Sequence, residues 1–170
     1  MISIPYGNTH LTMCEDGVVQ VLESRIGELK GAKSQEELVA QAMEHPLGTP
    51  PLWELARGKA SATIIISDHT RPVPSKKIIP FMLKQLRQGN PDIKITLLVA
   101  TGCHRGTRQE ELIKKLGQEI VEKEHILVHD CDDQTQLADL GVLPSGARLW
   151  INLSDVETAH VVPEVVNGTT

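Results

Sequence analysis

Two short polar loops carry side chains that could do acid–base and anion-binding chemistry. The first follows the apolar run Ala62–Ser67 and contains Asp68 and Arg71, with Pro72 next in the chain. An arginine held at the rigid end of a strand can bind a carboxylate or a phosphate through two parallel hydrogen bonds. Asp68 could orient that arginine or a nearby histidine. The same residues also fit an exposed loop with a local Asp–Arg ion pair, so the pattern leaves both interpretations open.

The second loop, Thr101–Gly106, contains Gly102 and His104. Glycine lets the backbone approach a ligand closely, and histidine takes up and returns a proton near neutral pH. A helix expected to start at Thr107 would point its first N–H groups toward this loop, which favours an anion there. We therefore predict that His104 is functional, whereas Cys103 is predicted to be a buried packing residue.

A third loop, His129–Asp133, is acidic. Its carboxylates, on Asp130, Asp132 and Asp133, could hold a hard cation. Aspartate is also common as a turn former and as the residue that caps a helix. We favour the structural interpretation and predict no metal site in the chain. Four other histidines lack supporting partners in the sequence and are interpreted as structural: His10, His45, His125 and His160.

Alternating strands and helices are predicted to bring these loops together. Short apolar runs rich in β-branched residues predict buried strands at Ala62–Ser67, Lys94–Ala100 and His125–His129. Two further strands are expected at Ala147–Asn152 and His160–Val166. Because parallel strands end at one edge of a sheet, where open α/β folds bind ligands, the three loops should gather there.

The segments between the strands read as helices, and the start of the chain reads as short β segments. Ser34 and Thr107 each have a glutamate three residues later, which is the pattern of a capping box. Gly89 is expected to stop the third helix. The predicted helices are Ser34–Glu44, Pro51–Ala56, Ser75–Gln88 and Thr107–Leu116, and the predicted N-terminal β segments are Met1–Pro5, Leu11–Met13 and Val18–Leu22.

The predicted fold is a single α/β domain over residues 1–170. It has a mainly parallel sheet with helices on both faces, in a Rossmann-like arrangement, and a short N-terminal β segment. A net charge of −5 without a basic stripe argues against a nucleic-acid partner. No apolar stretch approaches the about 20 residues of a membrane helix. Three cysteines without a C-x-x-C pair, and no signal-peptide pattern, predict a cytoplasmic protein.

Two segments resemble signatures of the nickel-pincer lactate racemase family. Ser67–Pro74, which reads SDHTRPVP, resembles the family's Asp-x-Thr-Arg-Pro signature. Val99–Arg105, which reads VATGCHR, resembles its Ala-Thr-Gly-x-His-Arg signature. Both occur in the family's order and spacing, and the resemblance extends to about Asn152. Weaker matches are Ile4–Gly7, His45–Gly48, and His129–Asp130 followed by Leu140–Gly141.

The resemblance implies an isomerase that racemises lactate or another small 2-hydroxy acid. In this family a hydride moves to and from a nickel pyridinium-3,5-bisthiocarboxylate mononucleotide. His104 matches the first of two histidines that deprotonate and reprotonate the substrate hydroxyl. Arg71 matches a position suited to polarising the substrate, with Asp68 in the same segment. The residues implied to face the cofactor are Asp68, His69, Thr70, Arg71, Thr101 and Gly102.

The resemblance also implies parts that this sequence lacks. The family continues with a second catalytic histidine, a glycine-rich stretch, a lysine that anchors the cofactor covalently and a histidine that binds nickel. Thr170 lies near the expected place of that second histidine, and no lysine follows Lys123. We therefore expect the family's C-terminal part to be absent and the chain to be inactive alone.

Two alternative functions remain open at the level of sequence. The chain could be a non-catalytic module, derived from the family, that binds an anion or a nucleotide. It could instead be a hydrolase in which His104 activates water or Ser67, although Ser67 lacks the nucleophile-elbow pattern.

Overall fold

The structure is a computed structural model, and it describes residues 1–18, 20–22, 24–28, 31, 33–153 and 161–163. The chain divides into two compact units, Met1–Ala32 and Lys33–Thr170. A single domain over residues 1–170 stays a prediction.

The N-terminal unit contains a β hairpin. Strands β1 (Ile2–Tyr6) and β2 (Thr9–Met13) pair antiparallel, with Gly7 in the turn at φ 57°, and a 3₁₀ turn, η1, follows at Arg25–Glu28. The first two predicted β segments are thus confirmed. The predicted strand at Val18–Leu22 is wrong for its described residues, because the chain reverses at Gly17 (φ 84°) and finds no described strand to pair with.

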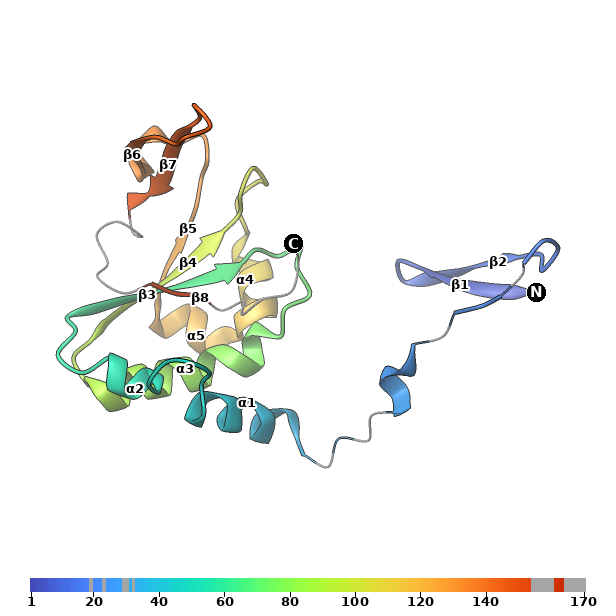
Figure 1. The fold of residues 1–170 in the computed structure, drawn as a ribbon, viewed down its shortest axis with the longest axis horizontal. Coiled ribbons are helices and arrows are strands. Elements are labelled where there is room, and N and C mark those ends of the chain that lie inside the picture. The colour runs from blue at the N-terminus through green and yellow to red at the C-terminus, as the bar shows by residue number, and fades with distance from the viewer. Residues whose placement is uncertain (19, 23, 29–30, 32, 154–160, 164–170) are drawn as a thin grey trace. The chain divides into compact units, whose positions relative to one another are not determined.

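The second unit is built on a parallel sheet with the strand order β5-β4-β3-β8 (Figure 1). Its strands are β3 (Ser61–Ser67), β4 (Lys94–Ala100), β5 (His125–Val128) and β8 (Val161–Pro163). The three predicted central strands are confirmed, and so is a mainly parallel α/β sheet. Of the predicted strand His160–Val166, Val161–Pro163 pairs with β3, and the other residues lie outside those described.

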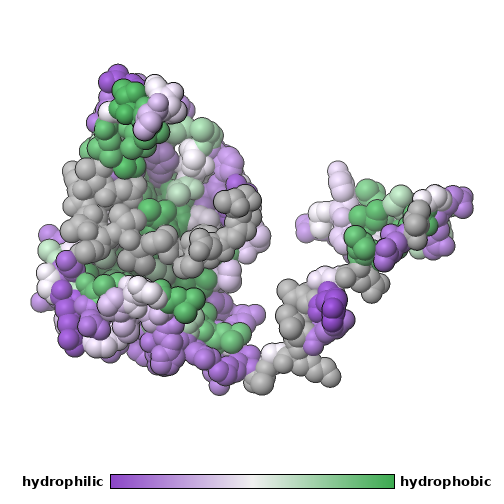
Figure 2. All heavy atoms as spheres, in the orientation of Figure 1, coloured by the Kyte–Doolittle hydropathy of each residue, from purple (hydrophilic) through white to green (hydrophobic). Residues whose placement is uncertain are grey.

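The described helices pack on one face of this sheet (Figure 1). They are α1 (Gln35–Glu44), α2 (Leu52–Leu55), α3 (Ser75–Gly89), α4 (Gln109–Leu116) and α5 (Gln118–Lys123). Alternate strand residues such as Ile64 and Leu97 meet α3 residues such as Ile79 in a fully buried core. Each such side chain contributes about 1.5–3 kcal/mol when removed from water. The solvent side of α1 and α3 is largely hydrophilic (Figure 2).

Within the described residues, a β hairpin rather than a helix meets the opposite face of the sheet. Strands β6 (Leu137–Val142) and β7 (Arg148–Asn152) pair antiparallel and form a separate sheet. The predicted strand Ala147–Asn152 therefore exists but is not a fourth parallel strand. The reason is the short turn before it, in which the Leu143 N–H donates to the Ala147 carbonyl over 2.8 Å, since a tight connection can join only antiparallel strands.

The helix ends differ from the sequence prediction in two places. Ser34 and Glu37 make the predicted capping box, with both reciprocal hydrogen bonds present. Helix α4 begins at Gln109, and the Glu111 carboxylate accepts the Arg108 N–H over 2.8 Å, so Thr107 is not its cap. The short helix α5 was not predicted, because its six residues are too few to show a clear helical periodicity. No described helix is long and apolar enough to cross a membrane.

Gly89 is the last residue of α3 and not the stop that follows it. A Cβ atom at Gly89 would lie 2.0 Å from the Trp53 carbonyl oxygen of α2. We predict that Gly89→Ala destabilises the chain by about 1–3 kcal/mol through overpacking, despite alanine's higher helix propensity. Urea unfolding measures this change. Gly106→Ala is the control, because its nearest neighbour would be Val128 Cγ1 at 3.8 Å. Equal stability of the Gly89 variant and the wild type would contradict the packing of α2 on α3.

Candidate active site

A buried aspartate and an exposed histidine form the centre of the candidate site. Asp68 follows β3 directly, and only 2% of its side chain is exposed. Its Oδ2 lies 2.6 Å from Nδ1 of His104. Its Oδ1 accepts two hydrogen bonds from Thr70, one from the backbone N–H at 3.1 Å and one from the hydroxyl at 2.6 Å. Both carboxylate oxygens of this buried group are therefore hydrogen-bonded.

These contacts keep Asp68 ionised. Burial raises the pKa of Asp68, but the Thr70 hydroxyl, His104 and the Thr70 backbone N–H together outweigh it and lower the pKa to about 2. An ionised carboxylate only accepts hydrogen bonds, so His104 must donate from Nδ1. The Nε2 atom of neutral His104 then carries a free lone pair. Because 48% of the His104 side chain is exposed, this nitrogen can take up a proton from a bound molecule.

The parallel register of β3 and β4 brings the two loops together. Ser67 pairs with Ala100, so Asp68 and Thr101 begin neighbouring loops at the same sheet edge. Gly102 adopts φ 57°, which few residues other than glycine tolerate. The resulting turn, closed by the His104 N–H donating to the Thr101 carbonyl over 3.0 Å, directs His104 back toward Asp68. The glycine in the second loop is thus needed for the turn itself.

His69 and Arg105 fix the outer side of the site. The Nδ1 atom of His69 lies 3.2 Å from the Thr107 hydroxyl. Arg105 donates two hydrogen bonds to Glu111, at 2.9 and 2.6 Å. These bonds and the Arg108 backbone N–H lower the pKa of Glu111 to about 2. The Thr107 hydroxyl, expected to cap α4, contacts a neighbouring loop instead.

Arg71 lines a pocket that does not include His104. A pocket of about 350 Å³ is lined by His69, Arg71, Pro72, Val73, Glu111, Lys114 and Lys115. His104 is not among these residues. The structure therefore brings Asp68 and His104 into contact but places Arg71 next to two lysines of α4. Lys114 and Lys115 were not predicted as site residues, although they lie within the predicted helix Thr107–Leu116.

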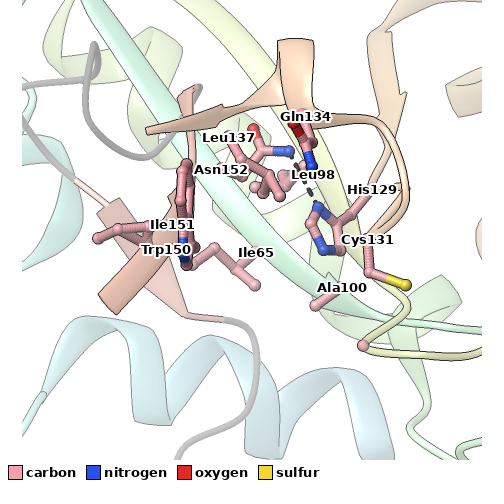
Figure 3. Close-up of a pocket in the computed structure, with 11 residues that line it drawn as sticks. Ile65, Leu98, Ala100, His129, Cys131, Gln134, Leu137, Trp150, Ile151 and Asn152 are labelled. Carbon is pink, nitrogen blue, oxygen red and sulfur yellow. Dashed lines mark hydrogen bonds between the residues drawn. The ribbon is translucent and has the colours of Figure 1, made fainter. Parts of the chain in front are cut away.

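A larger pocket lies between the sheet and the β6–β7 hairpin (Figure 3). Its volume is about 660 Å³, and its walls include Ile65 and Leu98 of the sheet and Trp150 of the hairpin. The Asn152 amide donates to Nδ1 of His129 over 3.1 Å, so the ring proton of neutral His129 lies on Nε2. This pocket was not predicted, because nothing in the sequence indicated that the hairpin folds over the sheet.

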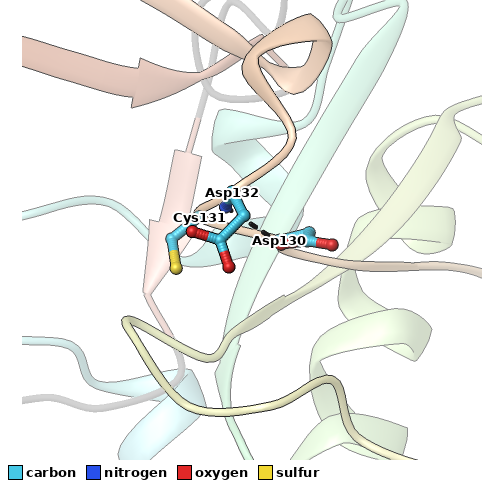
Figure 4. A group of neighbouring side chains, drawn as sticks. All are labelled: Asp130, Cys131 and Asp132. Carbon is cyan, nitrogen blue, oxygen red and sulfur yellow. Dashed lines mark hydrogen bonds between the residues drawn. The ribbon is translucent and has the colours of Figure 1, made fainter.

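The acidic loop after β5 is organised by its own hydrogen bonds. Asp130 Oδ1 accepts the Asp132 N–H over 3.0 Å, and Asp133 caps the 3₁₀ turn η2 (Gln134–Gln136). This agrees with the structural interpretation of these acids. Figure 4 shows Asp130, Cys131 and Asp132 close together. Burial and the neighbouring Asp132 raise the pKa of the Cys131 thiol, which disfavours the thiolate form that binds metals.

One prediction about a packing residue is wrong. Cys103, expected to be buried, is exposed. The reason is the turn at Gly102, which carries the chain away from the sheet before His104.

Comparison with known proteins agrees with the two signature loops. The family model of the lactate racemase N-terminal domain matches residues 6–167. The chain belongs to the lactate racemase family. It is 41% identical over 165 residues to a lactate racemase of Thermoanaerobacterium thermosaccharolyticum and 39% identical over 165 residues to one of Lactiplantibacillus plantarum. These alignments cover 96% of this chain but 39% of each relative.

The fold also agrees with a solved structure of this family. The apoprotein of the Thermoanaerobacterium thermosaccharolyticum lactate racemase superposes with a TM-score of 0.83 at 39% identity. The superposition covers 95% of this chain and 38% of that protein. The chain thus has the fold of one part of a lactate racemase.

Thr70 offers a test of the charge on Asp68. We predict that Thr70→Val raises the Asp68 pKa from about 2, because the 2.6 Å hydroxyl bond is lost and the burial of the carboxylate remains. The destabilisation should be about 1–3 kcal/mol, as for a lost hydrogen bond to a charged group. Carboxyl NMR titration and urea unfolding measure the two effects. Thr70→Ser keeps the hydroxyl and should behave like the wild type. An unchanged pKa in the valine variant would contradict this account of Asp68.

Proposed function

We propose that this chain is the N-terminal, substrate-facing part of a racemase that acts on lactate or a similar small 2-hydroxy acid. The observation that carries the proposal is the 2.6 Å contact between a buried, ionised Asp68 and an exposed His104 at the end of the sheet. Family membership gives this pair its chemical setting.

His104 and Asp68 divide the work of proton transfer. His104 Nε2 takes the proton of the substrate hydroxyl, and the imidazolium that forms is stabilised by Asp68. Asp68 also holds the ring in the tautomer with the proton on Nδ1, so it is a positioning residue. Arg71 binds the negatively charged part of the substrate or cofactor through its guanidinium group. When the reaction runs in the opposite direction, protonated His104 returns a proton to the same substrate oxygen.

The nickel-pincer cofactor fits this chain as a ligand that bears a phosphate. When bound, it would supply the acceptor and donor of the substrate hydride. The described residues offer a basic pocket that contains Arg71, beside the Asp68–Arg71 segment. The Thr70 hydroxyl is taken by Asp68 and the Thr101 hydroxyl by the His129 carbonyl at 2.6 Å. Thr70, Thr101 and Gly102 would therefore meet the cofactor mainly through backbone groups, and His69 through Nε2.

The metal itself would need ligands from elsewhere in a racemase. In the described part of the chain, one group of three side chains lies close enough together to hold a metal ion: Asp130, Cys131 and Asp132. Their oxygens and protonated thiol suit structural hydrogen bonding better than nickel. The proposal requires the remaining length of the relatives as a partner. That part would supply the residues that anchor the cofactor and bind nickel, and a second catalytic histidine. We also propose a cytoplasmic location.

The 170-residue chain alone should neither racemise lactate nor retain nickel. Racemisation needs a proton-transfer group on each face of the substrate, and the Asp68–His104 pair serves one face. Polarimetry on each lactate enantiomer measures the activity, and elemental analysis measures the metal. The positive control is this chain joined to the remaining length of a lactate racemase and loaded with cofactor. Turnover or stoichiometric nickel in the short chain would contradict the proposal, as would a loaded, full-length protein without racemase activity.

The basic pocket also favours one second candidate, a non-catalytic anion-binding module. It contains three cationic side chains and does not need His104. This candidate predicts anion binding in the full-length protein without any lactate interconversion. The polarimetric assay above separates the two functions.

A further inference from the structure

The pocket beside Arg71 concentrates positive charge on an acidic protein. Arg71, Lys114 and Lys115 line about 350 Å³ of space, whereas the chain as a whole carries a net charge of −5. In the described part of the chain, no carboxylate lies within ion-pair distance of Arg71 or Lys114. The ammonium group of Lys115 lies 3.4 Å from the Arg71 carbonyl oxygen, which holds the lysine against the loop. Three cations thus converge from two different elements.

The one acid in the pocket does not cancel this charge. Glu111 lines the wall, but Arg105 binds both of its oxygens, at 2.9 and 2.6 Å. Its pKa of about 2 keeps it ionised, so the Arg105–Glu111 pair is neutral as a unit at physiological pH. Among the described residues, Arg71 and Lys114 therefore keep their positive charges without an ion-paired carboxylate, and Lys115 lines the same pocket.

We propose that Arg71, Lys114 and Lys115 form a binding site for a phosphate monoester. A dianion with three acceptor oxygens matches one planar, bidentate guanidinium and two ammonium groups. A monovalent carboxylate would use only part of this set. The proposal extends the proposed function, because a mononucleotide cofactor would bring such a phosphate. The binding itself can be measured without activity.

A purely structural role is the alternative for the two lysines. Lys114 and Lys115 lie in the last turn of α4, where cations stabilise the helix dipole. In that role they would affect the stability of α4 but would not bind phosphate. The two roles are separated by measuring phosphate binding and thermal unfolding on the same variants.

The test is a titration of the 170-residue chain, followed by backbone amide NMR at constant ionic strength. The probes are inorganic phosphate, a nucleoside 5′-monophosphate and lactate. We expect both phosphates to shift the amides of residues 69–71, 73 and 111–115, and lactate to shift them at least about tenfold more weakly. If the nucleotide binds more tightly than inorganic phosphate, the site also contacts the sugar or the base. Equal binding of the two would confine recognition to the phosphate, and either result supports the site.

Two double variants complete the test. Lys114→Gln with Lys115→Gln should weaken phosphate binding about tenfold or more, as for the loss of charge-assisted hydrogen bonds. Lys84→Gln with Lys94→Gln removes the same charge from exposed positions on α3 and β4 and should change the affinity less than about twofold. The proposal is overturned by an absence of shifts in the wild type, by equal weakening in both double variants, or by lactate binding as tightly as phosphate. Racemase activity of the full-length protein is measured separately, so its absence leaves this result unaffected.

Discussion

Replacing His104 with alanine should lower lactate racemisation by about two to four orders of magnitude, as expected when a general base is lost. The expected loss is in kcat, because His104 Nε2 acts on the substrate proton and contributes little to holding the substrate. The measurement is polarimetric lactate interconversion by this chain joined to the remaining length of a lactate racemase. The fold should survive, since 48% of the His104 side chain is already exposed and Asp68 keeps both hydrogen bonds from Thr70.

A matched control comes from another histidine. His125 on β5 is exposed, and its Nδ1 lies 3.3 Å from the Thr96 hydroxyl. His125→Ala removes the same side chain from the sheet end opposite to the candidate site and should keep the wild-type rate within about threefold. If both alanine variants lose activity equally, a general effect of the substitution, such as lower stability, would explain the loss. His104 would then not be the base.

Replacing Asp68 with asparagine should lower the rate by roughly two orders of magnitude or more and should also change the tautomer of His104. Asparagine has nearly the same shape, but its NH₂ group can donate to Nδ1. The ring proton would then move to Nε2, the atom that must accept the substrate proton. Nitrogen NMR of labelled His104 distinguishes the two tautomers. A reduced rate with an unchanged tautomer would mean that Asp68 acts on the site in another way.

Asp68→Asn should also reduce the loss of unfolding free energy that occurs as the pH falls. The Asp68 pKa is about 2 in the folded protein against an ordinary value of 3.8. A lowered pKa means that the stabilisation is fully present above about pH 4–5 and is lost as the pH falls through 3.8 toward 2. The amount is about 2 kcal/mol. Urea unfolding between pH 2 and pH 7 should show an acid loss that is about 2 kcal/mol larger in the wild type than in Asp68→Asn, in which Glu111 still titrates. Parallel curves for the two proteins would contradict the assigned charge.

The central sheet was predictable because most residues of its middle strands, β3 and β4, are buried or half-buried. Runs such as Ala62–Ser67 and Lys94–Ala100 are mostly apolar and rich in β-branched residues, so they indicate strands without reference to neighbouring elements. The β6–β7 hairpin was harder. Leu137–Val142 mixes polar and apolar residues and has no clear alternation, and its strand state depends on pairing with Arg148–Asn152. Because that pairing depends on tertiary structure, the strand Ala147–Asn152 was predicted in the wrong sheet.

The candidate site was predictable to a similar extent. Asp68 and His104 lie in the loops that follow the adjacent strands β3 and β4. The topology of a parallel sheet is enough to predict that these loops are close together. The neighbours of Arg71 were not predictable, because they depend on how the packing of α4 places Lys114 and Lys115 beside the first loop. Likewise, Thr107 follows the pattern of a helix cap, yet its hydroxyl contacts His69. The sequence indicates which groups are present, whereas their final partners depend on packing between loops.

The most direct test of the account is the rate of lactate racemisation by four forms of the full-length, cofactor-loaded protein. The forms are the wild type, His104→Ala, Asp68→Asn and the double variant. If Asp68 acts through His104, the double variant should be as slow as His104→Ala alone, because removing the base leaves Asp68 nothing to position. A wild type that does not racemise lactate would contradict the proposed function. Losses that multiply in the double variant would contradict the claim that Asp68 and His104 act as one unit.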